Sequence, residues 1–196
     1  MWDVVGHDVV KSSVKVISCA VAIAFGLTLL AVTFDGSMAQ AEDREIKRGK
    51  VIWNNKSSCK NCHGWAGDGK GHPRSPRGPS LRDTALDRET MREVIACGVP
   101  GTAMPHHDRN AYTDDRCYGL IKADFEKSSA ALGAIPTKGN KTIRAEEIEM
   151  VLDYIEARIK GRGTVSSEEC DEYFKKTGTK RCGKLPKLAD IAEGQR

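Results

Sequence analysis

Cys59, Cys62 and His63 form a Cys-x-x-Cys-His pattern, the most chemically distinctive feature of the sequence. The pattern is compatible with a thiol–disulfide redox pair, half of a zinc site, or the attachment point of a c-type haem. A thioredoxin-like pair would follow a buried strand, and residues 45–58 contain no run of β-branched residues. A zinc site needs two further ligands, usually a second close pair, whereas the other cysteines are isolated. The pattern therefore favours haem attachment.

The spacing of these residues suits that chemistry. Each thiol would add to one vinyl group of the porphyrin, and the two vinyl groups lie about one helical turn apart. The histidine that follows Cys62 would then supply one axial nitrogen to the iron. We therefore expect one covalent haem c, held by Cys59 and Cys62 with His63 on the iron.

A second axial ligand is offered downstream by Met104, in a Gly-Thr-Ala-Met-Pro segment. Glycine and proline frame this methionine in a loop, where it is poorly placed to pack a core. His106 and His107 are the competing ligands. A His/Met pair would raise the reduction potential, whereas a pair of histidines would lower it.

Residues 1–41 are expected to direct export. Lys11 and Lys15 precede an apolar run over 16–34, and small residues at 37–41 could form a cleavage site. This order is typical of a signal peptide, although the run is also nearly long enough for a retained membrane anchor. The first alternative predicts a periplasmic protein, and the second a protein anchored in the inner membrane and facing the periplasm. The net charge of +4 is spread along the chain and does not indicate nucleic-acid binding.

Helices are expected over 43–54, 88–97 and 143–160. The middle helix begins after Asp87 as an N-cap and ends at Gly98. The last helix carries an apolar stripe at the helical period, formed by Ile148, Val151, Leu152, Ile155 and Ile159. No segment alternates like a strand, so the predicted class is all-α.

Several short patterns follow one another in a characteristic order. They are Gly49-x-x-x-Trp53, Cys59-Lys60-Asn61-Cys62-His63-Gly64, Gly67-Asp68-Gly69-Lys70-Gly71, Gly78-Pro79-Ser80-Leu81 and Met104-Pro105. Together with the last helix they resemble a class I, mono-haem cytochrome c of the bacterial periplasmic type, over roughly 44–160. The resemblance implies helices wrapped around one haem. It also implies that the Pro79 carbonyl accepts from Nδ1–H of His63, and that Gly49 packs under Tyr154 where the first and last helices cross.

Three arginines near the motif are candidates to bind the haem propionates. Arg74, Arg77 and Arg82 lie within thirteen residues of sequence, "GHPRSPRGPSLRD", and arginine is a natural bidentate partner of carboxylates. The alternative is a solvated basic loop.

The chain departs from a minimal cytochrome in two places. The domain at 42–160 contains a long insertion at 105–142, and an extension at 161–196 follows it. The four cysteines outside the motif can pair in three ways. We expect Cys97–Cys117, which would pin the Met104 loop, and Cys170–Cys182 within the extension.

The resemblance implies a one-electron carrier and not an enzyme. Its implied partners are a periplasmic dehydrogenase, for instance a quinoprotein, and a quinol–cytochrome c oxidoreductase or a terminal oxidase. One alternative is a membrane-tethered subunit of a larger dehydrogenase or oxidase complex, which requires the N-terminal segment to be retained. The other is a haem sensor or enzyme with a labile sixth ligand.

Overall fold

The computed structural model describes residues 39–194. The chain divides into two compact units, Met1–Arg44 and Glu45–Arg196. Residues 39–44 are helical, and the apolar run at 16–34, on which the signal-peptide and anchor alternatives rest, lies outside the described residues. Of the helices that are described, none combines the length and the apolar character needed to cross a bilayer.

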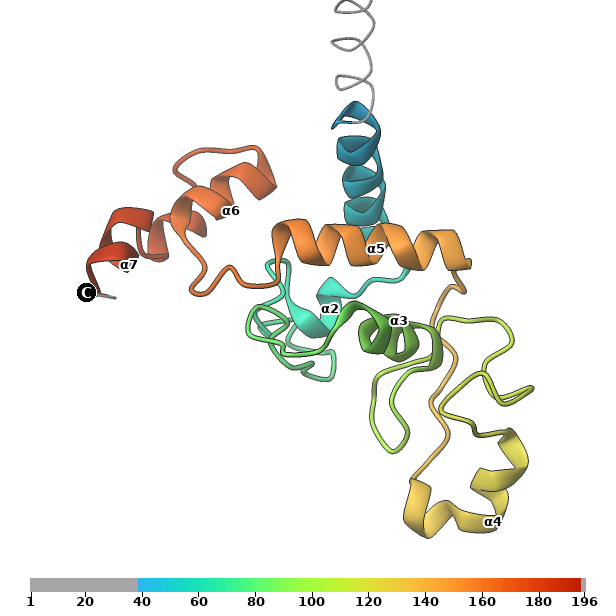
Figure 1. The fold of residues 1–196 in the computed structure, drawn as a ribbon. Coiled ribbons are helices and arrows are strands. Elements are labelled where there is room, and N and C mark those ends of the chain that lie inside the picture. The colour runs from blue at the N-terminus through green and yellow to red at the C-terminus, as the bar shows by residue number, and fades with distance from the viewer. Residues whose placement is uncertain (1–38, 195–196) are drawn as a thin grey trace, which may run out of the picture. The chain divides into compact units, whose positions relative to one another are not determined.

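The second unit is built from helices and loops (Figure 1). Residues 45–51 are helical, and a π-helical turn, Ile52–Lys56, follows them. The short helix α2, Lys60–His63, carries most of the Cys-x-x-Cys-His motif. The remaining elements are α3 Arg88–Cys97, α4 Lys122–Leu132, α5 Ala145–Arg158, α6 Ser167–Phe174, the 3₁₀ turn Cys182–Lys184 and α7 Leu188–Gly194. Over residues 39–194 only two isolated β-bridges occur, and no strand. The expected all-helical character is confirmed for this part of the chain.

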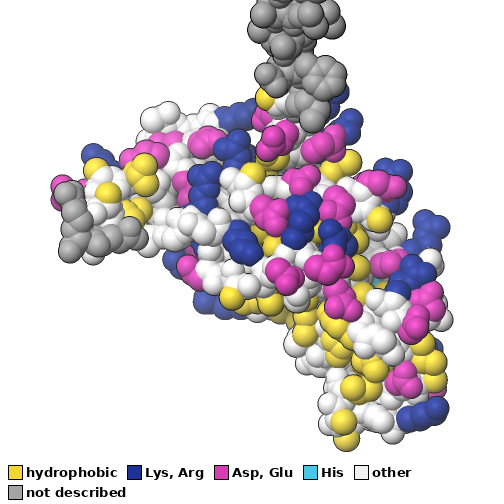
Figure 2. All heavy atoms as spheres, viewed as in Figure 1, with side chains coloured by type: hydrophobic (Ala, Val, Ile, Leu, Met, Phe, Trp, Pro, Cys, Tyr) yellow, Lys and Arg dark blue, Asp and Glu magenta, His cyan; other side chains and the backbone are white. Residues whose placement is uncertain are grey.

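Helices α3 and α5 pack against each other and supply most of the core. The side chain of Asp87 accepts from the Thr90 amide at 2.8 Å and caps α3, which ends at Gly98 as expected. The whole apolar stripe expected for the last helix is buried. On the solvent side, Arg88 and Arg92 pair with acidic residues of α5, and Figure 2 shows the two charge types interspersed over this face.

Gly49 allows the first helix to lie directly against α5. A Cβ atom at this position would stand 1.9 Å from the Met150 carbonyl oxygen and 2.8 Å from Cβ of Tyr154. Both separations are far below van der Waals contact, so only glycine fits. The expected pairing of Gly49 with Tyr154 is therefore present, and it brings Trp53 into the core beside Tyr154, with ring centroids 6.1 Å apart.

We predict that Gly49→Ala will lower the free energy of unfolding by about 1–3 kcal/mol, because α5 must shift to admit the methyl group. Chemical denaturation of the full chain measures this change. Gly183→Ala is the control, since a Cβ at Gly183 meets nothing within 4 Å, and we expect it to change stability by less than about 0.5 kcal/mol. Equal effects of the two substitutions would contradict the proposed close packing.

The insertion has a small core of its own. Buried Cys97, Tyr112, Cys117 and Phe125 form an apolar cluster that is separate from the main core. Tyr112 and Phe125 meet edge to face with ring centroids 5.1 Å apart. Helix α4, which the sequence did not lead us to expect, delivers Phe125 to this cluster.

Candidate haem-binding site

A cavity of about 460 Å³ lies beside the Cys-x-x-Cys-His motif. Its walls come from α2, the 76–86 loop, α3, the 99–105 loop and one residue of α5. Most of the lining is apolar: Pro76, Pro79, Leu81, Leu86, Met91, Val94, Ile95, Val99, Ala103, Pro105 and Ile155. Its volume is within the range of ~300–1,000 Å³ that is usual for cofactor pockets.

His63 is held in one orientation at the edge of this cavity. Its Nδ1 lies 3.0 Å from the Pro79 carbonyl oxygen, the pair implied by the resemblance. A carbonyl can only accept, so Nδ1 carries the proton and the lone pair of Nε2 is left for a metal. Burial lowers the pKa of His63, which keeps the imidazole neutral, as coordination requires.

Gly78 completes the support of the His63 ring. A Cβ at Gly78 would stand 2.6 Å from Cε1 and Nδ1 of that ring. The backbone before Pro79 can therefore lie against the imidazole only because residue 78 has no side chain.

Cys59 and Cys62 are free thiols on the same helical turn. The amides of Cys62 and His63 both donate to the Cys59 carbonyl, at 3.1 and 2.9 Å, which fixes that turn. Cys62 lines the cavity, and burial raises the pKa of the Cys59 thiol to about 12. The motif is preceded by a π-helical turn and followed by loops, unlike a thioredoxin setting. Within residues 39–194 no three His, Cys, Asp or Glu side chains gather as a metal-ion site, so the zinc interpretation finds no further ligands there.

Met104 lines the same cavity as His63, and the competing histidines do not. Nδ1 of His106 lies 2.9 Å from the Asp108 carbonyl oxygen, and Nδ1 of buried His107 lies 3.1 Å from that of Lys141. Both rings are therefore held by backbone of the insertion. Of the three candidate sixth ligands, Met104 is the one on the cavity wall, and its binding to iron stays a prediction.

The three arginines are placed differently from one another. Arg77 lines the cavity and is exposed, and Arg74 lies exposed on the same loop, so both remain proposed propionate contacts. Arg82 is 3% exposed, and each of its five N–H groups has an acceptor in Ala66, Arg162, Gly163 or Glu169. No donor of Arg82 is left for a propionate, so the expected propionate contact is wrong for this residue. The sequence did not indicate this role, because the partners are distant along the chain.

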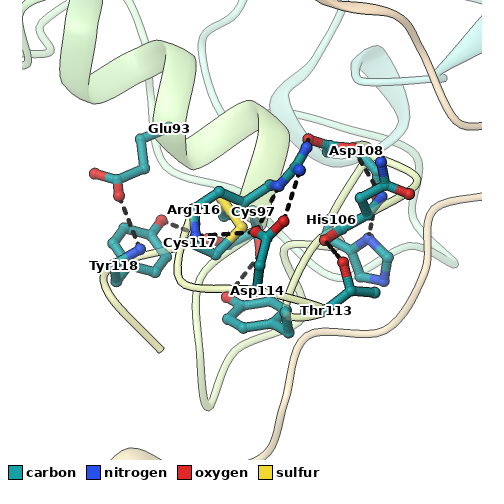
Figure 3. The surroundings of a disulfide bond; sticks show 12 residues. Glu93, Cys97, His106, Asp108, Thr113, Asp114, Arg116, Cys117 and Tyr118 are labelled. Carbon is teal, nitrogen blue, oxygen red and sulfur yellow. Dashed lines mark hydrogen bonds and ion pairs between the residues drawn. A yellow bond between two sulfur atoms is a disulfide. The ribbon is translucent and has the colours of Figure 1, made fainter. Parts of the chain in front are cut away.

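The insertion holds the Met104 loop from two sides. The structure contains both expected disulfides, and Cys97–Cys117 joins the end of α3 to the insertion (Figure 3). The hydroxyl of Tyr112 donates to the Cys97 carbonyl at 2.9 Å, and that of Tyr118 donates to the Gly98 carbonyl at 2.6 Å. Neither tyrosine could be recognised from the sequence, where the only signal is an aromatic residue in a polar segment.

Backbone hydrogen bonds complete this support. The Gly101 amide donates at 2.8 Å to the carbonyl of Ala134, which lies just after the end of α4 in the sequence. Two residues after Met104, the His106 amide donates to the Thr137 carbonyl at 2.9 Å. The segments directly before and after Met104 are thus both held by residues 134–137, which follow α4.

The residues of this site fit a c-type haem. An apolar cavity of suitable size is bordered by two thiols on one helical turn, a neutral imidazole with a free Nε2, and a thioether. The close approach of Gly78 leaves the imidazole little room to turn. This donor set is the one that His/Met ligation of a covalent haem requires.

Comparison with known proteins agrees with this geometry. Residues 44–123 match the family model described as cytochrome C oxidase, cbb3-type, subunit III. No curated protein and no solved structure significantly matches the chain. The match supports a c-type cytochrome domain over these residues, and with it a haem protein of electron transfer. The match ends within α4, before α5 and the extension.

Proposed function

We propose that this c-type cytochrome is a one-electron carrier in which His63 and Met104 hold the two axial positions of a single haem. The observation that carries the proposal is that both residues line one cavity beside the paired thiols. When bound, the haem supplies the one-electron iron couple. His63 and Met104 would leave no open position for a substrate, so we propose that the protein is not an enzyme.

The protein's own residues would do two things for electron transfer. The apolar walls of the cavity exclude water, which favours the reduced, less charged form of the haem and so raises the reduction potential. The thioether of Met104 acts in the same direction. The held ring of His63 and the loop attachments of Met104 keep the same ligands in both oxidation states. A geometry that does not change between these states needs little reorganisation when the electron moves.

Carbon monoxide tests this assignment directly. We expect the reduced wild-type protein to take up carbon monoxide slowly or not at all, because both axial positions are filled. Rapid binding would instead support the haem sensor or enzyme alternative, which needs a labile sixth ligand.

We further propose that the carrier works in the periplasm with protein partners. Its electrons would come from a dehydrogenase, for instance a quinoprotein, or from a quinol–cytochrome c oxidoreductase, and would pass to a terminal oxidase. The family description names an oxidase subunit, and this favours the terminal oxidase among the proposed partners.

The extension offers a surface for steering such partners. Six cationic side chains are exposed between 173 and 189, where the sequence has no Asp or Glu: Lys175, Lys176, Lys180, Arg181, Lys184 and Lys187. Clustered cations raise the rate of encounter with an acidic protein face. We call these six residues the basic loop of the extension.

We predict that Lys180→Glu together with Lys184→Glu will slow electron exchange with an acidic redox protein about tenfold at low salt. Added salt should reduce the difference in rate between the wild type and this double variant, since it screens exposed charges. Stopped-flow measurement over a range of ionic strength checks this. The control is Lys180→Arg with Lys184→Arg, which keeps the charge and should exchange as the wild type does; a slow control would show that charge is not the cause.

The same family description favours a second candidate, a membrane-tethered subunit of a larger complex. This candidate requires that the N-terminal segment is retained. Two measurements distinguish the diffusing carrier from the tethered subunit: fractionation of cells that express the full chain, and Edman sequencing of the product. Recovery in the soluble periplasmic fraction with a new N-terminus near 40–42 supports the diffusing carrier. Recovery in the membrane with the original N-terminus supports the tethered subunit.

A further inference from the structure

Arg82 lies where the C-terminal extension meets the haem-binding loops. Its Nη1 and Nη2 donate to the two carboxylate oxygens of Glu169 in α6, at 2.8 and 2.9 Å. The same two nitrogens donate to the carbonyls of Ala66 and Arg162, at 3.1 and 3.0 Å, and Nε donates to that of Gly163. One buried guanidinium thus joins three segments of the chain: the loop of Ala66, the loop of Arg82 itself, and the extension.

Two of these segments carry His63 and its hydrogen-bond acceptor. Ala66 is three residues after His63, and Arg82 is three residues after Pro79. A second link runs in parallel, since the Leu81 amide donates to the Gly67 carbonyl at 2.7 Å. The relative position of these loops sets the geometry of the bond from Nδ1 of His63 to Pro79.

Glu169 is what allows Arg82 to remain buried. The side chain of Arg82 is 2% exposed, and a buried cation without its counter-charge is strongly unfavourable. If the carboxylate is lost, the guanidinium gains by moving toward water, and its bond to Ala66 is broken. The link between the two loops therefore depends on a residue of the extension.

Helix α6 is fixed within the extension by a cap and a disulfide, and it packs on the domain through Tyr173. Its N-cap Ser166 accepts from the Glu169 amide at 3.2 Å, and Cys170 is bonded to Cys182. At its other end Tyr173 packs on Trp65, two residues after His63, with ring centroids 4.8 Å apart. Glu169 therefore reaches Arg82 from a rigid support.

We propose that the C-terminal extension positions the proximal ligand of the haem: Glu169 holds Arg82, and Arg82 holds the loops that set the hydrogen bond between His63 and Pro79. The inference rests on the proposed function, in that His63 is taken to bind the iron. Glu169 and Arg82 are positioning residues and touch neither the ligand nor the cavity. A weaker bond from Nδ1 makes the imidazole a poorer donor to iron, which raises the reduction potential.

The test compares three full-length, haem-loaded proteins: the wild type, Glu169→Gln and Glu172→Gln. Glutamine at 169 keeps the shape of the side chain and removes its charge. Glu172 lies on the same helix and pairs only loosely with Arg158, at 3.4 Å, with 70% of its side chain exposed. This control loses the same charge but leaves Arg82 unchanged.

The first readout is exchange of the His63 Nδ1 proton with solvent, followed by NMR in the reduced, diamagnetic protein. The loss of a charge-assisted hydrogen bond leads us to expect about tenfold faster exchange in Glu169→Gln. We expect Glu172→Gln to exchange as the wild type does. The second readout is the reduction potential, which should be higher in Glu169→Gln than in Glu172→Gln.

Unchanged exchange of the Nδ1 proton in Glu169→Gln would overturn the inference. This holds even if the potential is raised, since a raised potential without faster exchange would identify a purely electrostatic effect of the lost charge. Failure of the proposed function is distinguishable, because the wild type itself would then lack the spectrum of a His/Met-ligated haem.

Discussion

Met104→Ala is expected to remove the weak far-red sulfur-to-iron charge-transfer band from the spectrum of the oxidised protein. The band requires a thioether on the iron, and of the three candidate ligands only Met104 lines the cavity. The substitution should also lower the reduction potential, because a thioether favours the reduced iron. Optical spectra of the oxidised and reduced protein, with a redox titration, measure both effects.

The same variant should bind carbon monoxide rapidly once reduced, because alanine leaves the sixth position open. His106 and His107 are not expected to replace the lost ligand, since both rings are held by backbone of the insertion. Met91→Leu is the matched control, because Met91 also lines the cavity but is buried in α3. A band that survives Met104→Ala would show that the sixth ligand is another residue.

Removing the Cys97–Cys117 disulfide by a double substitution to serine is expected to cost roughly 3 kcal/mol of stability, on the loop-entropy estimate for this length of closed loop. Denaturant titration followed by circular dichroism measures this loss. The bond also joins α3 to the segment that supports Met104. We therefore expect the far-red band to disappear at a lower denaturant concentration than the helical signal does.

The disulfide of the extension provides the comparison. Removing Cys170–Cys182, with a sequence separation of 12 against 20, should also lower stability. It should leave the loss of the far-red band coincident with unfolding, since that bond does not touch the Met104 loop. If both double variants lose the band together with the helical signal, the insertion does not act as a separate support for the methionine.

The parts of the site that the sequence predicted are those set by local patterns. Cys59, Cys62 and His63 lie within one helical turn, so their spacing alone determines that they act together. The helix at 145–158 follows from the period of its apolar residues, and α3 from its cap and terminal glycine. Features of this kind depend on residues that are close in sequence, so one sequence is enough to predict them.

Helix α4 could not be predicted in this way. Only Phe125 is buried along Lys122–Leu132, and Ser128 interrupts the helical backbone with φ of −134° and ψ of 35°. The helix exists because Phe125 packs on Tyr112 and because Cys117 is bonded to Cys97. Tertiary packing, and not propensity, determines its position.

Arg82 shows a second limit of sequence patterns. Three nearby arginines look equivalent in the sequence, and carboxylate recognition is a sound expectation for each of them. Arg82 does bind a carboxylate, but it is that of Glu169, a residue of the extension. Which carboxylate an arginine meets is decided by how distant segments pack, and the sequence around it carries no sign of that choice.

Covalent attachment of one haem to Cys59 and Cys62 is tested most directly by the intact mass of the purified protein. After denaturation and extraction with acidic organic solvent, we expect the mass of the polypeptide plus one haem. The double variant Cys59→Ser with Cys62→Ser should have the mass of the polypeptide alone. A wild-type protein that also shows only the polypeptide mass, when produced with haem-attachment machinery, would contradict the account.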